Sequence, residues 1–217
     1  MQRREFNRHL QRSAIALALS PWLQAVAAPA DQARAWRVNP FALGVASGRP
    51  RPDSMVLWTR LLFSDEDRAL GTEALRVQVE VFADAALKRR VQQATVVTDD
   101  TRAHSVHWHV QRLQPSTDYW YRFRQGDALS AVGHTRTAPA MNAEVRQLRI
   151  ALASCQHYEQ GQFVAHQEIA QQALDFVLFM GDYIYESSNP QYAVRKHHGE
   201  EPKSLAQYRA RYEQYKR

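Results

Sequence analysis

The sequence predicts a chain in two parts, a β-sandwich followed by the start of an α/β domain with a parallel sheet. Two observations lead to this fold class. Short runs of alternating or β-branched residues recur between residues 38 and 140, with turn residues between them. From residue 146 to 217, two apolar runs are separated by an amphipathic stretch, which is typical of a strand-helix-strand unit.

The first part is expected to hold about seven short strands, the number typical of a β-sandwich. Turn residues separate most of them, as at PRPDS (50–54) and TDD (98–100). The expected strands are residues 41–47, 55–61, 75–82, 94–98, 105–110, 119–123 and 132–137.

One segment makes this prediction more specific. Residues 113–123 (LQPSTDYWYRF) resemble the tyrosine corner of fibronectin type III domains. In that motif Tyr119, Tyr121 and Phe123 alternate onto the core face, and the Tyr119 hydroxyl bonds back to the backbone of the corner. The sequence therefore predicts a fibronectin type III-like sandwich over residues 38–140.

Other aromatic residues and histidines in this part have two interpretations each. Core packing is the favoured interpretation of Trp58 and Trp108, and a carbohydrate or ligand platform is the alternative. His107 and His109 would share one face of a strand, where they could bind a metal, but a half-exposed strand is favoured. The sandwich is therefore expected to support a site rather than to catalyse.

The second part begins after a break in the β pattern near Ala140, and we expect it to span residues 146–217. Its strands are apolar on both faces, as buried parallel strands are. The expected elements are a strand at residues 148–153, a helix at 163–173 and a strand at 176–180.

Candidate metal ligands follow both of these strands. Cys155, the only cysteine, comes directly after the first strand, and Asp182 follows the second. Because the carboxyl ends of neighbouring parallel strands lie side by side, these residues should meet, and Tyr185 can turn back toward them. A thiolate, a carboxylate and a phenolate together favour a trivalent metal. The second oxygen of Asp182 could bridge to another cation, as in two-metal hydrolysis of phosphate esters.

Structural interpretations compete with these roles. A lone cysteine is most often a small buried hydrophobe, and a Gly-Asp pair after a strand is common turn chemistry. His157 lies close to the expected crevice and is a candidate phosphate contact. His197 and His198 are adjacent, and neighbouring residues rarely point at one ion, so a solvated loop is the favoured interpretation there.

At these residues the chain resembles the PhoD-like alkaline phosphatases and phosphodiesterases. The shared segments are ASCQ (153–156), GDYIYE (181–186), FALGVASG (41–48), VLWTRL (56–61) and LAQYRARY (205–212). The resemblance implies a calcineurin-like metallophosphatase domain after the sandwich, which hydrolyses phosphate mono- and diesters. It also implies a ferric ion (Fe3+) held by Cys155, Asp182 and Tyr185, with calcium (Ca2+) in an adjoining site bridged by that aspartate.

The amino terminus predicts export. Residues 2–8 (QRREFNR) fit a twin-arginine signal, followed by an apolar stretch at 14–23 and a cleavage site at AVA (25–27). The stretch is too short and too broken to span a bilayer permanently. We therefore expect a signal peptide at residues 1–27, the twin-arginine machinery as a partner, and a periplasmic or secreted protein that can be exported already folded with its metal.

Charge and cysteine content exclude other classes. Four arginines and one glutamate of the net charge of +6 lie in the first 12 residues, which leaves a mild excess of three. The basic residues do not cluster with aromatics as a nucleic-acid groove requires, so nucleic-acid binding is not expected. One cysteine cannot form an internal disulfide.

Two function classes remain open. In the family, a Trp-Asp-Asp-His segment follows the tyrosine- and arginine-rich helix, and this sequence contains no such segment. The sequence is therefore expected to be an amino-terminal fragment of an exported phosphatase, inactive alone. The alternative is a non-catalytic secreted β-sandwich module with a vestigial phosphatase tail. Iron or calcium bound at Cys155, Asp182 and Tyr185 would favour the phosphatase fragment, and the absence of both metals would favour the non-catalytic module.

Overall fold

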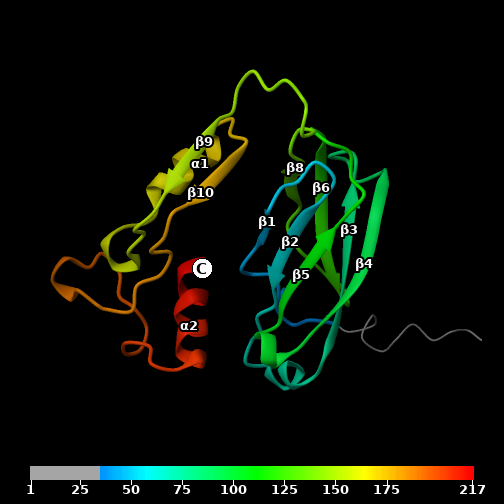
Figure 1. Ribbon diagram of the computed structural model, residues 1–217. Helices are drawn as coiled ribbons and strands as arrows, with labels where there is room; N and C mark the ends of the chain where they lie inside the picture. Colours follow the sequence, from blue (N-terminus) through cyan, green and yellow to red (C-terminus); the bar gives the residue numbers. More distant parts are fainter. Residues whose placement is uncertain (1–34) are drawn as a thin grey trace, which may run out of the picture.

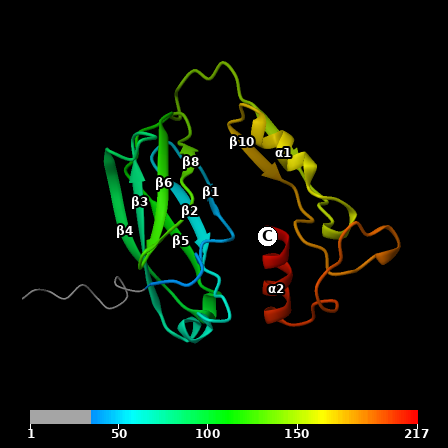
Figure 2. The ribbon, with the colours of Figure 1, turned by 180° about the vertical axis from the view of Figure 1, so that it is seen from behind.

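The computed structural model describes residues 35–217. Figures 1 and 2 show two antiparallel sheets on one side and a small β-α-β unit on the other, joined by a long connection. The predicted signal peptide at residues 1–27 lies outside the described residues. Among residues 35–217, no helix is both long enough and apolar enough to cross a lipid bilayer.

The two antiparallel sheets make up the first part of the described chain. One has the strand order β1-β2-β5, and the other β4-β3-β6-β7, with β8 also paired to β6. The first sheet consists of β1 (Val45–Gly48), β2 (Met55–Arg60) and β5 (Ser105–Val110). The second consists of β3 (Leu75–Phe82), β4 (Arg90–Thr98), β6 (Asp118–Gln125), β7 (Ala128–Leu129) and β8 (Gly133–Arg136). Single helical turns η2 (Arg68–Thr72) and η3 (Asp100–Arg102) lie in the connections. We call residues 41–138 the two-sheet region.

Each strand expected in this region has a counterpart, and those at residues 75–82 and 105–110 begin and end where predicted. Strand β1 begins later than expected because residues 41–44 form a turn. The Gly44 N–H donates to the Phe41 carbonyl at 3.0 Å, and Gly44 has a φ of +73°, which glycine adopts without strain. Strand β7 has only two residues, too few to produce a recognisable pattern.

The apolar faces of the two sheets meet in one hydrophobic core. Leu57 and Val106 from the first sheet and Val79 and Phe123 from the second are each at most 1% exposed. Burial of each such side chain contributes about 1.5–3 kcal/mol to folding. Because side chains alternate between faces along a strand, a slip of one residue would expose this whole set, so the core fixes the strand register.

Strand β6 carries the aromatic residues that the sequence placed in the core. Tyr119, Tyr121 and Phe123 are all buried, and the residues between them are only partly buried. The Tyr119 hydroxyl accepts a hydrogen bond from the Gln114 N–H at 2.9 Å. This bond ties the start of β6 to the preceding corner, as the tyrosine-corner resemblance predicts.

The tryptophans and histidines of the first sheet differ in part from expectation. Trp108 packs against the core, as predicted. Trp58 instead lies beneath the helix α2 (Leu205–Lys216), with the Lys216 ammonium 5.2 Å from its ring centroid, so core packing was wrong for Trp58. His107 and His109 are exposed on a half-exposed strand, as the favoured interpretation held.

The second part begins with a parallel pair of strands. Strand β9 (Ile150–Ala153) pairs with β10 (Phe176–Phe179), and helix α1 (Val164–Gln171) connects them. This is the predicted strand-helix-strand unit, although each element is shorter than expected. Leu152 is 61% exposed and Leu178 is 49% exposed, so apolar side chains of this sheet remain in contact with solvent in the described chain. Two further helical turns follow its strands, η4 (Tyr158–Gln160) and η5 (Pro190–Tyr192).

Helix α2 is capped at its start and held against the first sheet. The Ser204 hydroxyl accepts from the Gln207 N–H, and the Gln207 side chain accepts from the Ser204 N–H, which is a reciprocal capping box. Both ribbon views place α2 beside the sheet β1-β2-β5. An ion pair at 3.5 Å joins Arg60 of β2 to Glu213 of α2. The two-sheet region therefore supports one side of the helix.

Removal of the Tyr119 hydroxyl should destabilise the protein. We expect Tyr119→Phe to lower the free energy of unfolding by about 1 kcal/mol, because the Gln114 N–H loses its partner in a partly buried corner. Urea denaturation measures this. Tyr192→Phe is the control, since Tyr192 is largely exposed. An equal, negligible effect of both substitutions would contradict a stabilising corner.

The connection between the two parts should be the first site of proteolysis. Residues 141–149 are exposed and outside regular structure, and Met141 is 95% exposed. Trypsin should cleave at Arg146 or Arg149 and leave the two-sheet region intact, which mass spectrometry of the fragments would show. Equal resistance along the whole chain would contradict this expectation.

Candidate metal centre

The parallel pairing of β9 and β10 brings the two candidate loops together. Pairing continues past the strands, because the Cys155 N–H donates to the Gly181 carbonyl at 3.3 Å and the Gln156 N–H donates to the Asp182 carbonyl at 3.2 Å. The Gln156 side chain adds a bond to the Tyr183 carbonyl at 2.8 Å. Cys155 and Asp182 thus occupy adjacent positions at the carboxyl ends of the strands, as the sequence predicts.

Two of the predicted ligands approach one oxygen of the third. The Cys155 thiol lies 3.4 Å from Asp182 Oδ2, and the Tyr185 hydroxyl donates to the same oxygen at 3.0 Å. Partial burial raises the pKa of the Tyr185 phenol, and the neighbouring Asp182 and Cys155 raise it further. Each of these residues can supply a negatively charged ligand atom once its proton is lost, so the set suits a highly charged cation.

Backbone strain occurs at both ligand positions. Cys155 has a φ of +55° and Asp182 a φ of +53°, the left-handed region that side chains with a Cβ rarely adopt. Such residues cluster at functional sites, where the surrounding structure holds them in place. Here the hydrogen bonds between the two loops hold both conformations.

Cys155 is exposed, so the interpretation of it as a buried hydrophobe is wrong. A hollow of about 530 Å³ opens beside it, and its lining includes His157, Phe163 and His166. Within residues 35–217, no three histidine, cysteine, aspartate or glutamate side chains are grouped to hold a metal. The cluster at Cys155 reaches three ligands only through the phenol of Tyr185.

His157 stands beside this cluster. Its ring centroid is 4.7 Å from that of Tyr185, and its Nδ1 accepts a hydrogen bond from the Glu159 N–H at 3.2 Å. The contact to Tyr185 puts His157 next to the candidate ligands, and its role as a phosphate contact stays a prediction.

His197 lies in a buried polar network and not in a solvated loop, so that expectation was wrong. Its side chain is 1% exposed and stacks on the ring of Tyr158, with centroids 5.5 Å apart. Burial lowers the pKa of His197 to about 4, and the nearby Arg211 contributes to the shift, so the imidazole is neutral at pH 7. His198, in contrast, is exposed.

The centre of this network is Glu159, which the sequence analysis did not single out. It is 1% exposed, and its carboxylate accepts from the Ser188 hydroxyl and the Asn189 N–H, each at 2.7 Å, and from the His197 N–H at 3.0 Å. Burial raises its pKa, but these hydrogen bonds outweigh burial and lower the pKa to about 2. One carboxylate therefore fixes the loop that follows Tyr185.

Helix α2 contributes residues that the sequence analysis also missed. Arg211 and Tyr215 are buried and contact the loop that contains Tyr185. A sequence signal was available, because Tyr208, Tyr212 and Tyr215 recur at the spacing of one helix face. Glu159 carried no comparable signal, since its importance depends on contacts with residues about 30 positions away.

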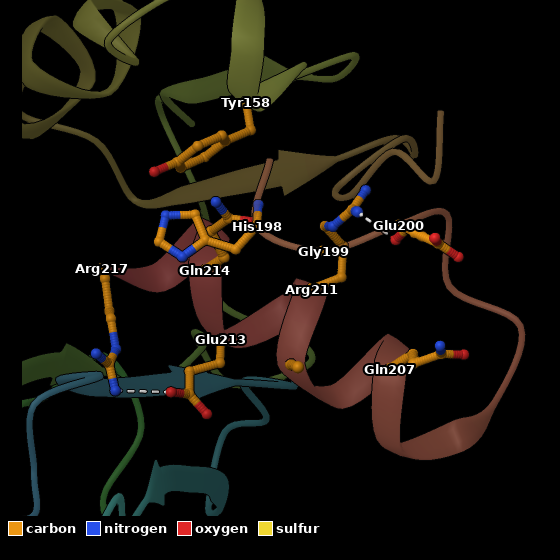
Figure 3. A pocket seen from close by; sticks show the side chains of 10 residues that line it. Tyr158, His198, Gly199, Glu200, Gln207, Arg211, Glu213, Gln214 and Arg217 are labelled. Carbon is orange, nitrogen blue, oxygen red and sulfur yellow. Dashed lines mark hydrogen bonds and ion pairs between the residues drawn. The ribbon is translucent and has the colours of Figure 1, made fainter. Parts of the chain in front are cut away.

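A second hollow, of about 420 Å³, flanks α2 and is shown in Figure 3. Its two arginines already have partners. Arg211 donates to the Glu200 carbonyl at 3.1 Å, and Arg217 pairs with Glu213 at 2.7 Å. The lining residues do not converge on a point as the Cys155 cluster does, so this hollow is not the candidate site.

Comparison with known proteins agrees with this fold. The family "PhoD-like phosphatase, N-terminal domain" matches residues 25–139, and "PhoD-like phosphatase" matches residues 150–217. Alkaline phosphatase D of Bacillus subtilis (strain 168) is 42% identical over 183 residues, which are 82% of this chain and 31% of that protein. A solved structure described as "Structure of PhoD" matches with a TM-score of 0.79 and 40% identity, over 85% of this chain and 36% of that one.

These matches define a phosphatase class. The chain belongs to the PhoD-like phosphatase family. It spans about a third of the length of the relatives it matches, 31% of the curated protein and 36% of the solved structure.

Glu159→Gln should lower the free energy of unfolding by about 2 kcal/mol at pH 7, because the Ser188, Asn189 and His197 donors lose a charged acceptor. The folded-state pKa of Glu159 lies below the ordinary value of 4.5, so its contribution is present above pH 4.5 and is lost as the pH falls toward 2. The difference between the parent protein and the variant should therefore shrink over that window.

Chemical denaturation at a series of pH values measures this difference. Glu144→Gln is the control, because Glu144 lies in the exposed connection. A difference that stays constant from neutral to acidic pH would show that the charge of Glu159 does not stabilise the network.

Proposed function

We propose that this chain takes part in the metal-dependent hydrolysis of phosphate mono- and diesters, as an exported phosphatase of the alkaline phosphatase D type. The observation that carries the proposal is the convergence of the Cys155 thiol and the Tyr185 hydroxyl on one oxygen of Asp182, at the ends of two parallel strands. Family membership supports the reaction class, and the phosphate ester is the substrate that this class implies.

Cys155, Asp182 and Tyr185 would hold the first metal, which we propose to be Fe3+. When bound, such a metal supplies Lewis acidity and lowers the pKa of water enough for attack on a phosphate ester at neutral pH. The carboxylate of Asp182 has a second oxygen, which suits contact with an adjoining Ca2+. His157, packed on the Tyr185 ring, is the proposed phosphate contact.

The proposed organisation of the chain has three parts. A fibronectin type III-like sandwich spans residues 38–140, and the hydrogen bond from Gln114 to the Tyr119 hydroxyl supports this assignment. A calcineurin-like metallophosphatase unit begins at residue 146, and the parallel β9-α1-β10 unit supports it. Residues 1–27 direct twin-arginine export to the periplasm or the exterior, a proposal that depends on sequence alone.

Metal binding tests the proposal directly. The purified chain should take up about one equivalent of Fe3+, since the three ligands form one cluster. Asp182→Asn and Cys155→Ser should each weaken iron binding by about tenfold or more, because each removes a charged ligand. Elemental analysis after dialysis against ferric citrate, with and without calcium, measures this.

Glu168→Gln, on the exposed side of α1, is the control carboxylate and should bind iron as the parent protein does. Equal iron content in the parent protein, Asp182→Asn and Cys155→Ser would overturn the assigned ligands. A parent protein that takes up no iron or calcium would instead favour a non-catalytic two-sheet module.

A further inference from the structure

We propose that Tyr215 of α2 is a positioning residue that sets the geometry of the metal ligands through a single hydroxyl group. This inference rests on the proposed function, because it concerns the same three ligands. Tyr215 does not touch the ligand atoms of Cys155, Asp182 or Tyr185. It acts on the backbone of the two loops that carry them.

The Tyr215 hydroxyl oxygen joins both ligand loops. It accepts a hydrogen bond from the Tyr158 N–H at 3.1 Å and another from the Tyr185 N–H at 3.0 Å. Tyr158 lies three residues after Cys155, and Tyr185 lies three residues after Asp182. The loops are thus bound to each other at their start, through Cys155 and Gly181, and bound to one common oxygen three residues further on.

A third polar group completes the surroundings of this hydroxyl. A phenol oxygen has two lone pairs and one proton, and the two backbone N–H groups can occupy the lone pairs. His197 Nε2 lies 3.1 Å from the same oxygen. The other ring nitrogen of His197 lies 3.2 Å from Arg211 Nη1 and 3.7 Å from the Glu159 carboxylate. The Tyr215 hydroxyl is therefore held by two backbone amides and one buried imidazole.

Arg211, one helical turn before Tyr215, holds the other side of the same loop. Its Nη1 donates to the Tyr185 carbonyl and to the Glu186 carbonyl, each at 2.8 Å. The N–H and the C=O of Tyr185 are therefore both bound by α2, because residues four apart lie on one face of a helix. The backbone of Tyr185 is thus held on both sides, at a position from which its phenol reaches Asp182 Oδ2 at 3.0 Å.

The helix that presents these groups is itself held firmly. Tyr215 is 5% exposed, and its ring packs on Tyr158 and Phe163 with centroids 5.4 and 5.9 Å apart. On the opposite side, Arg60 of the two-sheet region bonds to the Arg209 carbonyl at 3.3 Å. The two-sheet region thus supports α2, and α2 in turn positions the ligand loops.

Tyr215→Phe tests the proposal because it keeps the ring packing and removes only the hydroxyl. The matched control is Tyr212→Phe on the same helix, since Tyr212 packs on the Tyr183 ring but makes no hydroxyl hydrogen bond to the described residues. In metal-free protein, the amides of Tyr158 and Tyr185 should exchange with deuterium faster in Tyr215→Phe and at the parent rate in Tyr212→Phe.

Binding of Fe3+ distinguishes a positioning role from a purely structural one, because a purely structural role would leave iron affinity and absorption unchanged. We expect Tyr215→Phe to bind Fe3+ about tenfold more weakly than the parent protein, the size typical of losing a group that orients a metal ligand. Its phenolate-to-iron absorption band should also shift or weaken at saturating iron. Tyr212→Phe should keep both the affinity and the band of the parent protein.

The outcomes separate this inference from the proposed function. If the parent protein and Tyr215→Phe bind iron with equal affinity and equal absorption, the positioning role is overturned and the proposed function stands. If the two amides exchange at parental rates in Tyr215→Phe, the geometric basis of the inference is wrong. If the parent protein takes up no iron at all, the proposed function and the inference both fail.

Discussion

Parallel pairing between β9 and β10 is the interaction on which the candidate centre depends. Only a parallel pair places the carboxyl ends of two strands at the same edge, and the pairing continues into the loops that hold Cys155 and Asp182. Both residues then adopt a positive φ, and the inter-loop bonds hold the backbone in that conformation. The thiol, the carboxylate and the phenol meet as a result of this backbone arrangement.

The sequence predicted where the strands lie better than it predicted which distant segments pack against them. Alternation located the strands of both sheets, and the tyrosine corner predicted the role of Tyr119, because these signals are local. The position of Trp58 was missed, since it depends on a helix about 150 residues later that covers the outer face of β2. The same limit applied to His197, which sequence context placed in solvent and the fold buries.

The candidate ligands were predictable because each follows a recognisable strand, whereas the groups that support them were not. Glu159 and Tyr215 act through contacts between segments far apart in the chain. The tyrosine spacing of α2 marks a helix face, but it does not show which loops that face contacts. Their environment is polar yet buried, so each hydrogen bond there is costly to lose and contributes to a single defined arrangement. Cys155 and Asp182 are exposed and Tyr185 is half-buried, and the stability of their geometry comes from this buried layer.

The equal spacing of the two ligand loops restricts how the chain can vary in length. Surface loops usually tolerate insertions, because lengthening a connection costs little free energy. Here both loops are bound at their start and again at Tyr158 and Tyr185, where a single oxygen receives them. With one residue added or deleted in either loop, the Tyr158 N–H and the Tyr185 N–H could no longer both reach the Tyr215 hydroxyl. Variation in chain length is therefore expected elsewhere, in segments such as the exposed connection at residues 141–149.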